Sequence, residues 1–362
     1  MRIVHFNPNL ISRGKERRLL ELIKFQSHDK KNDVTLVLFE NKIEYDIKDI
    51  NFNLIFLERK KRFSIKLFFS LITILNTIKP DIVHSWNTMT TFYLIFIKPF
   101  VSFPIVNNQI STKPLKPYRL NLENILIHFN IIFSNVVLAN SYAGKESYHY
   151  KKIKVIHNGI NLNRFKIKFN AHSFKKKYQI GTKKVILMVG HFNNQKNWKL
   201  FVDLAEKYFN KKIMDVSFIG IGYGEDYVHY NTLLKQKKLE NIRLIGKINE
   251  VEKFIFCSSI CILLTKSEGI SNFILESMAM RKAIITTDII GGSSEVIVNN
   301  FNGYLSEPNL EKLFLLINSI INNKKLLGKI GNNAFKSIEL NFSISKMGKS
   351  YNKIYKSLLY AK

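Results

Sequence analysis

The sequence has little of what several common protein classes need. Two cysteines in 362 residues exclude a disulfide scaffold, and 16 glycines with 7 prolines exclude a collagen-like chain. No stretch of 18 uncharged apolar residues occurs, so no membrane-spanning helix is predicted. No long apolar run follows Met1, so no secretory signal is predicted either. The most apolar N-terminal segment, 91–106, fits a core helix entering a buried strand, or alternatively a partial dip into a membrane interface.

The two cysteines give no sign of a metal site. Cys257 and Cys261 lie four residues apart, and no other cysteine or histidine stands near them at the spacing of a zinc site. We therefore expect buried, reduced thiols and no bound metal.

Acidic residues are scarce relative to basic ones. The chain has 27 Asp and Glu against 56 Lys and Arg, a net charge of +29, and only ten of the basic residues are arginine. Codon usage in an AT-rich genome is an alternative source for part of this excess. A charge of this size attracts anions, so nucleic acid, an anionic membrane and phosphorylated substrates are all candidate partners.

Short β-branched runs alternate with amphipathic helical stretches along the chain, which predicts parallel sheets covered by helices on both faces. The pattern restarts after residue 156, so we expect two doubly wound α/β domains. The predicted parts are an N-terminal domain over 1–160, a C-terminal domain over 161–341, and a final helix over 342–362 packing back toward the first domain. The default ligand site is the cleft between two such domains.

The strongest motif is KSEGISNFILESMAM, at 266–280, which follows the apolar run 261–265. Its two glutamates, Glu268 and Glu276, are separated by seven residues, with a predicted helix N-terminus between them. Such an N-terminus can hold a phosphate, and a glutamate further along the helix can accept both hydroxyls of a ribose. Two spaced glutamates alone also fit an amphipathic helix with solvated acids.

The segment SEGISNFILESMAMRKAIITTDIIGGSSEVI resembles the glutamate-x7-glutamate signature of retaining glycosyltransferases of family 4. Five further segments resemble elements of that family: KPDIVHSW (79–86), VIHNGINLNRF (155–165), VGHFNNQKNWKLFVDLAEKY (189–208), FIGIGYGED (218–226) and FNGYL (301–305). The resemblance covers nearly the whole chain and is densest in the C-terminal half. It implies the GT-B fold, with two Rossmann-like domains facing a central cleft. The N-terminal domain would bind the acceptor and the C-terminal domain the nucleotide sugar.

The resemblance also implies roles for individual residues. Lys196 matches the lysine that grips the diphosphate, whereas His191 replaces an expected arginine. Glu268 would meet the transferred sugar, and His84 is a second catalytic candidate near the acceptor. The residues implied in donor binding are Gly14, His191, Lys196, Gly246, Lys247, Gly269, Ile270, Ser271, Asn272, Phe273 and Glu276.

The implied reaction is transfer of a hexosyl group from a nucleotide sugar, with UDP favoured over GDP, and with retention of anomeric configuration. No cofactor or metal is expected, because a lysine and a helix N-terminus can supply the positive charge. The acceptor would be a saccharide, free or linked to a polyprenyl diphosphate, in lipopolysaccharide, O-antigen, capsule or exopolysaccharide synthesis. The expected location is the cytoplasm, at the inner face of the bacterial plasma membrane.

Basic clusters in the N-terminal domain suggest contact with the acceptor or an anionic membrane. These candidates are Arg13, Arg17, Arg18, Lys60, Lys61, Arg62, Lys113 and Lys116. A solvated lysine-rich surface is the simpler alternative. Rival functions are a basic nucleic-acid-binding protein, for which no recognition motif is visible, and a GT-B-like nucleotide-sugar epimerase. A lone G-x-G-x-G at 220–224 is weak support for a dinucleotide site.

Overall fold

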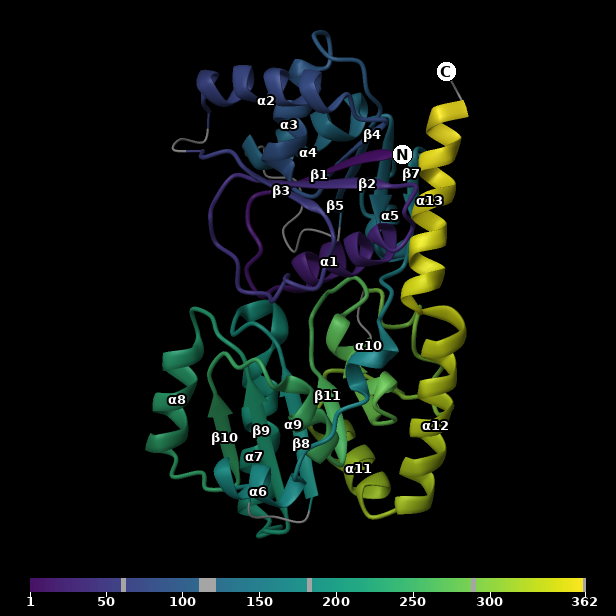
Figure 1. Ribbon diagram of the computed structural model, residues 1–362. Coiled ribbons are helices and arrows are strands. Elements are labelled where there is room, and N and C mark those ends of the chain that lie inside the picture. Colours follow the sequence, from purple (N-terminus) through teal and green to yellow (C-terminus); the bar gives the residue numbers. More distant parts are fainter. Residues whose placement is uncertain (60–62, 111–121, 181–183, 288–290, 361–362) are drawn as a thin grey trace. The chain divides into compact units, whose positions relative to one another are not determined.

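The computed structural model describes residues 1–59, 63–110, 122–180, 184–287 and 291–360. The chain divides into two compact units (Figure 1). Unit 1 comprises Met1–Gly159 and Ile344–Lys362, and unit 2 comprises Ile160–Ser343. The chain therefore enters unit 2 once and returns to unit 1 with its last helix.

Unit 1 is built on a parallel sheet whose described strands follow the order β3-β2-β1-β4-β5-β6-β7. The strands are β1 (Arg2–Asn7), β2 (Asp33–Leu38), β3 (Asn53–Phe56), β4 (Ile82–Ser85), β5 (Ile105–Ile110), β6 (Val136–Ala139) and β7 (Ile153–Val155). The helices are α1 (Gly14–Ser27), α2 (Ile65–Ile78), α3 (Thr88–Ile97), α4 (Leu122–Phe133), α5 (Tyr142–Glu146) and α13 (Ile344–Tyr360).

Helices cover both faces of the sheet of unit 1. Alternate residues of each strand point to opposite sides and are therefore buried on both. Along β1, Ile3 joins the cluster that includes α1 and α13, whereas Val4 and Phe6 join the cluster of α2, α3 and α4. Both of these β1 faces are fully buried. The sequence consequently reads as a near-continuous apolar run rather than as an alternating one.

Unit 2 repeats the design with a sheet whose described strands follow the order β10-β9-β8-β11-β12-β13. The strands are β8 (Lys184–Val189), β9 (Val216–Ile221), β10 (Ile242–Ile245), β11 (Ile260–Leu263), β12 (Ala283–Thr287) and β13 (Tyr304–Ser306). The helical elements are η1 (Leu162–Phe165), α6 (Ala171–Lys177), η2 (Asn194–Lys196), α7 (Trp198–Asn210), α8 (Tyr227–Gln236), α9 (Val251–Cys257), α10 (Asn272–Ala279), α11 (Leu310–Ile321) and α12 (Lys324–Asn341).

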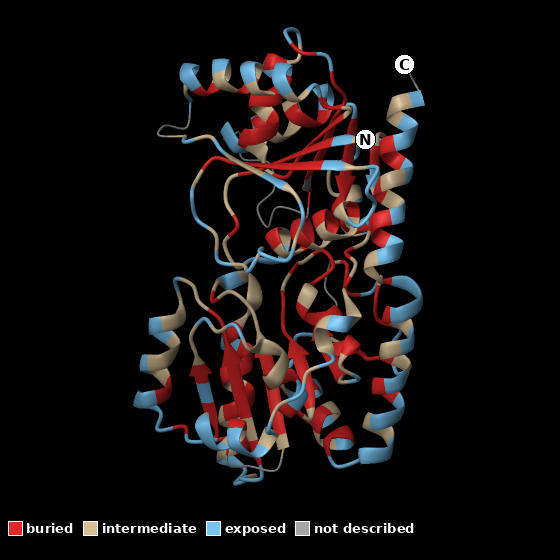
Figure 2. Cartoon of the chain, in the orientation of Figure 1, coloured by how far each residue is buried: buried red, intermediate tan, exposed pale blue. Residues whose placement is uncertain are grey.

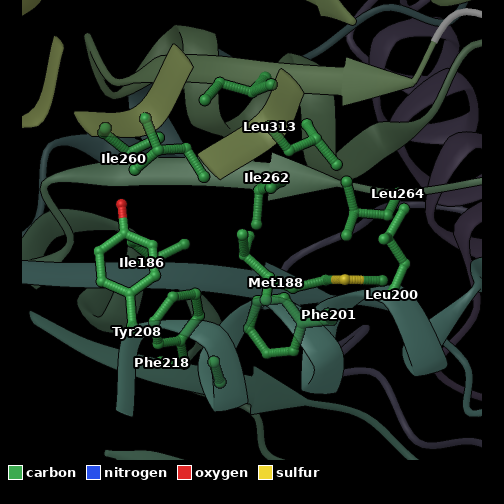
Figure 3. Close-up of a cluster of buried hydrophobic side chains, with 14 of the residues drawn as sticks. Ile186, Met188, Leu200, Phe201, Tyr208, Phe218, Ile260, Ile262, Leu264 and Leu313 are labelled. Carbon is green, nitrogen blue, oxygen red and sulfur yellow. The ribbon is translucent and has the colours of Figure 1, made fainter. Parts of the chain in front are cut away.

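The largest core cluster of unit 2 lies on one face of this sheet. Ile186, Met188 and Ile262 of the strands pack there against Phe201 of α7 and Leu313 of α11 (Figure 3). Figure 2 shows the central strands of both units as buried along most of their length. The packed cores fix the positions of the strands, and therefore the points at which the loops at the strand ends begin.

The predicted doubly wound α/β architecture is confirmed in both units. Each sheet is parallel, and each strand order reverses direction once, between β1 and β4 in unit 1 and between β8 and β11 in unit 2. Both cysteines are free and buried, as expected. Among the described helices none is long and apolar enough to cross a membrane.

Candidate functional site

The residues of the glutamate motif lie at the point where the strand order of unit 2 reverses. In open α/β sheets, ligands bind outside the carboxyl ends of the strands at such a point. The two loops involved follow β8 and β11, and backbone contacts tie them together. The backbone N–H of Lys266 donates to the carbonyl of Gln195 at 2.8 Å, and the Gln195 side chain donates to the carbonyl of Ser267.

Lys196 and Glu268 meet at this junction. The Lys196 ammonium donates to Glu268 Oε2 at 2.5 Å, and the two side chains are 12% and 21% exposed. Lys196 ends the short helix η2, where the Asn193 side chain caps it by accepting from the Lys196 N–H at 3.1 Å. Two groups of opposite charge are thus held at one place, neither of them fully desolvated.

Glu276 is 8% exposed on α10 and has a cationic partner that the sequence reasoning missed. Arg164 donates through Nη2 to Glu276 Oε1 at 2.6 Å and through Nε to Glu252 Oε1 at 3.0 Å. Arg164 lies on η1, within the segment VIHNGINLNRF (155–165), which resembles an element of the family 4 glycosyltransferases. One guanidinium therefore fixes two carboxylates from α9 and α10, a geometry to which its planar fork is suited.

Paired glycines let a third loop approach Glu268. Gly292 donates its N–H to the carbonyl of Glu268 at 2.8 Å. A Cβ on Gly291 would lie 2.3 Å from that same carbonyl oxygen, and one on Gly292 would lie 2.7 Å from the backbone of Ile270. The Gly-Gly pair is required because residues 291 and 292 run against the backbone of the glutamate motif.

The G-x-G-x-G segment serves packing within this group of loops. A Cβ on Gly222 would lie 1.8 Å from the carbonyl oxygen of Gly190, and Gly220 leaves room for the ring of Trp198. Gly224 has a φ of +148°, a conformation that side chains rarely adopt. Gly222 and Gly224 are thus accounted for by the close approach of the β9 end to the loop after β8, and Gly220 by its packing against Trp198 of α7 and Leu244 of β10.

His191 stands at the edge of the same group of loops. Its ring lies edge-on to Tyr223 at 4.8 Å, and the Lys247 ammonium lies over the Tyr223 ring at 5.5 Å. The imidazole Nδ1 lies 3.7 Å from a carboxylate oxygen of Glu225 but makes no hydrogen bond. Gly246 and Lys247 directly follow β10, so they too lie at the carboxyl edge of the sheet.

The remaining donor-site candidates surround the start of α10. The helix begins at Asn272, with Ser271 as its N-cap residue. Ile270, Ser271 and Phe273 are only 3–5% exposed. Gly269 leads into this turn. The sequence-predicted residues of unit 2 therefore all gather at the carboxyl end of one sheet.

The structure corrects the expectation for His84. It lies within β4 and is fully buried, with its ring 4.6 Å from that of Trp86. Its Nδ1 is 2.6 Å from the hydroxyl of Tyr355 on α13. Burial, together with the neighbouring His5 and Arg18, lowers the pKa of His84 well below its ordinary value. A neutral ring that is fully buried against α13 does not reach a substrate, so the prediction that His84 is a catalytic residue is wrong.

Arg18 is also corrected. It was expected at an acceptor or membrane surface, but it is 6% exposed and donates to Asn108 at 2.9 Å and to the Tyr351 hydroxyl of α13. Its role in the described contacts is to join α1, β5 and α13. Arg13 is exposed as the N-cap residue of α1, and Gly14 begins that helix.

Arg17 is half-buried, with its guanidinium 5.3 Å from the centre of the Tyr45 ring. The other basic candidates, Lys60, Lys61, Arg62, Lys113 and Lys116, lie outside the described residues. No group of three or more His, Cys, Asp or Glu that could hold a metal ion occurs among the residues that the structure describes.

Comparison with solved structures defines the fold class. A crystal structure of Anabaena HepE in complex with UDP and glucose superposes with a TM-score of 0.86, covering 99% of this chain and 100% of that one at 17% identity. A glycosyltransferase of Rickettsia africae gives a TM-score of 0.83 at 22% identity, covering 99% and 98%. Likeness at such identities concerns the fold, which is GT-B, with two Rossmann-like domains.

Sequence comparison supports the family. Residues 170–337, all within unit 2, match the family model "Glycosyl transferases group 1". An uncharacterized glycosyltransferase of Methanocaldococcus jannaschii is 30% identical over 207 residues, which are 56% of this chain and 53% of that protein. The UDP-Gal:alpha-D-GlcNAc-diphosphoundecaprenol alpha-1,3-galactosyltransferase of Escherichia coli is 30% identical over 202 residues, 54% of this chain and 51% of its own length. The chain thus matches about half the length of these curated relatives, and together the matches support the group 1 glycosyltransferase family.

Proposed function

We propose that the chain is a glycosyltransferase that uses a nucleotide sugar, with the donor bound by unit 2. The observation that carries the proposal is the meeting of Lys196, Glu268 and the start of α10 where the strand order of unit 2 reverses. A diphosphate needs fixed positive charge, and a lysine beside a helix N-terminus supplies it. The match of the family model to this unit supports the same conclusion.

Each group has a proposed part in the transfer. Lys196 and the backbone of 269–273 neutralise the charge that develops on the leaving diphosphate. Glu276, fixed by Arg164, accepts the ribose hydroxyls. Glu268 orients the transferred sugar so that its anomeric carbon faces the acceptor. In this scheme Lys196 exchanges Glu268 for the diphosphate when the donor binds.

The finer identity of the reaction rests on relatives. A UDP donor is favoured because the E. coli relative is named for UDP-Gal and the Anabaena structure contains UDP. The same E. coli name specifies a diphosphoundecaprenol-linked acceptor, which supports a lipid-linked saccharide as acceptor here. We include retention of configuration, a hexosyl group and a role in bacterial surface-polysaccharide synthesis in the proposal, because the glutamate motif resembles retaining enzymes.

A thermal-shift screen of the full chain against a panel of UDP- and GDP-sugars tests this function. A bound donor stabilises the folded state by mass action, by about 2.7 kcal/mol at 100 times Kd. We expect a rise in Tm with one UDP-sugar that exceeds the rise with UDP alone. A panel in which no nucleotide sugar raises Tm would contradict the proposal.

A further inference from the structure

Three neighbouring helices of unit 1 present an apolar surface for which the proposed chemistry has no use. Helices α2, α3 and α4 cover one face of the sheet through inward residues such as Leu71, Leu94 and Leu126. The three helices have 14, 10 and 12 residues, and only Lys66 and Glu123 among these carry a charge at neutral pH. Their outward sides are therefore unusually poor in charge for helices on a protein surface.

Helix α4 shows this most plainly. Leu122, Ile125, Ile132 and Phe133 are between 49% and 53% exposed. Their spacing places all four on one side of a helix with 3.6 residues per turn. The inward side is already filled, since Ile131 is fully buried. The helix therefore has a second apolar side that the described part of the chain leaves exposed.

Aromatic rings extend this side of α4 onto α3 and toward α2. The ring of Phe129 on α4 lies 5.6 Å from Phe96 and 5.9 Å from Phe92 on α3. Phe92 in turn lies 5.8 Å from Phe63, which precedes α2. Phe96 and Phe63 are 47% and 51% exposed. We call this continuous surface of α4, α3 and Phe63 the aromatic face; a contiguous patch of this kind marks an interaction site.

Lysines stand at the edge of the aromatic face. Lys66 is exposed in the first turn of α2, next to Ile65, which is 78% exposed. Lys152 donates to the carbonyls of Ile132 at 2.5 Å and Ser134 at 3.0 Å, which places its ammonium at the end of α4. Lys98 follows α3 and borders a surface pocket of about 560 Å³.

Phe100, which is 62% exposed, also lines that pocket, and its ring lies 5.8 Å from Phe68 of α2. The pocket walls combine apolar side chains such as Phe103 and Leu358 with the cationic Lys98 and the polar Asn135. An apolar hollow with a cation at its border suits an acyl chain whose phosphate stays outside.

We propose that the aromatic face docks onto an anionic lipid bilayer, with its apolar side chains in the interface and the surrounding lysines toward lipid phosphates. Stable attachment to a membrane needs apolar insertion and electrostatic attraction together, and this surface offers both. A protein partner would match the apolar area but would give no reason for the lysines at its edge. The inference deepens the proposed function, on which it rests only in that a lipid-linked acceptor would be met at the same membrane.

Flotation of the full chain with vesicles tests the proposal. The vesicles contain phosphatidylcholine alone, or phosphatidylcholine and phosphatidylglycerol in equal amounts. The double variant Ile125→Gln and Ile132→Gln removes apolar groups from the aromatic face without touching the core. The matched control, Leu315→Gln and Leu340→Gln, changes two residues of unit 2 that are 64% and 69% exposed.

We expect the wild type and the control to float with the anionic vesicles, and the double variant to bind them at least about ten-fold more weakly. Lys66→Gln should weaken binding at low salt and have less effect at high salt. Equal vesicle binding by all variants would overturn the proposal, as would dimerisation of the wild type in solution that the double variant abolishes. UDP binding by calorimetry, measured on the same samples, separates this failure from failure of the proposed function, because the double variant should bind UDP like the wild type.

Discussion

At the scale of single residues, the candidate site consists of charges that are already paired. Lys196 holds Glu268, and Arg164 holds both Glu276 and Glu252. Pairing lowers the cost of keeping partly buried charges and fixes the direction of each side chain. A ligand that brings its own negative charge can replace one carboxylate at Lys196 while Arg164 keeps the other in place.

Substitutions of Arg164 can separate an effect on UDP affinity from an effect on the free energy of unfolding. Arg164→Met should leave two carboxylates unpaired, lowering the free energy of unfolding by roughly 3 kcal/mol and weakening UDP binding about ten-fold. Arg164→Lys should recover part of the affinity, because an ammonium keeps the charge but cannot span both carboxylates in one plane. Chemical unfolding and calorimetry provide the two measurements. If Arg164→Met loses stability but keeps its affinity for UDP, the arginine has a structural role only.

The sequence could suggest which residues lie together where both follow strands of one sheet, but it could not show individual side-chain partners. The glutamate motif and Lys196 lie together because both follow strands of the same sheet. Arg164 pairs with a carboxylate 112 residues away, and the His84 ring is closed off by Tyr355, 271 residues away. No periodicity reports such partners, so the Arg164 pair was missed and the burial of His84 was not anticipated.

At the scale of elements, the sequence predicted most strands because both sheets are parallel and buried, which produces apolar runs. The edge strands β3 and β7 were not predicted, and the residues of β3 are exposed or only partly buried. The apolar segment at 91–106 forms a core helix that leads to a buried strand, which was one of its two predicted alternatives. It contains most of α3, which packs in the core and also contributes Phe96 to the aromatic face, and the start of β5.

The loop contacts at the carboxyl ends of β8 and β9 lead to a prediction for Gly222. Gly222→Ala should destabilise the chain by about 2 kcal/mol, because the added Cβ would overlap the backbone of Gly190. The displaced β8 loop carries Lys196, so UDP affinity should fall as well.

Gly328 of α12 provides the matched control, since a Cβ there would meet nothing within 4 Å. Gly328→Ala should raise stability by roughly 0.5–1 kcal/mol through helix propensity. Unfolding in urea measures both variants. Equal behaviour of the two would show that the loop gives way and that Gly222 is not needed for close packing.

At the scale of the whole molecule, we expect the two units to differ in their sensitivity to acid. Burial lowers the pKa of His5 from 6.5 to about 4 despite its hydrogen bond with Gln26, and the pKa of His84 is lowered too. The two rings lie 5.0 Å apart, and Arg18 adds further positive charge nearby. Unit 1 therefore contains a buried site where protonation is unfavourable.

The sign of the resulting pH dependence follows from proton binding. Between pH 6.5 and about 4 the unfolded chain binds more protons than the folded one, so stability falls as the pH drops through that range. His5 alone should cost about 3 kcal/mol by pH 4. Fluorotryptophan NMR distinguishes the units, because Trp86 lies beside both histidines and Trp198 lies in unit 2. Loss of the Trp198 signal before that of Trp86 on acidification would contradict this prediction.

The net charge of +29 has no single explanation in the structure. The candidate donor site accounts for a few cations, and Arg18 is used to attach α13. The membrane proposal draws on three lysines at the edge of the aromatic face, of which Lys66 is exposed and Lys98 and Lys152 are half-buried. The donor chemistry does not depend on them, so the two proposals can fail separately.

The donor site is the central claim, and calorimetric titration of the full chain with UDP and with GDP tests it most directly. The wild type should bind one of these nucleotides. Lys196→Ala should bind the same nucleotide about 10- to 100-fold more weakly, because a charge-assisted contact with the diphosphate is lost. Lys184→Ala is the matched control, since Lys184 pairs with Asp215 at the opposite end of β8 and should leave the affinity unchanged. Equal binding by the wild type and Lys196→Ala, or binding of neither nucleotide by the wild type, would contradict the account.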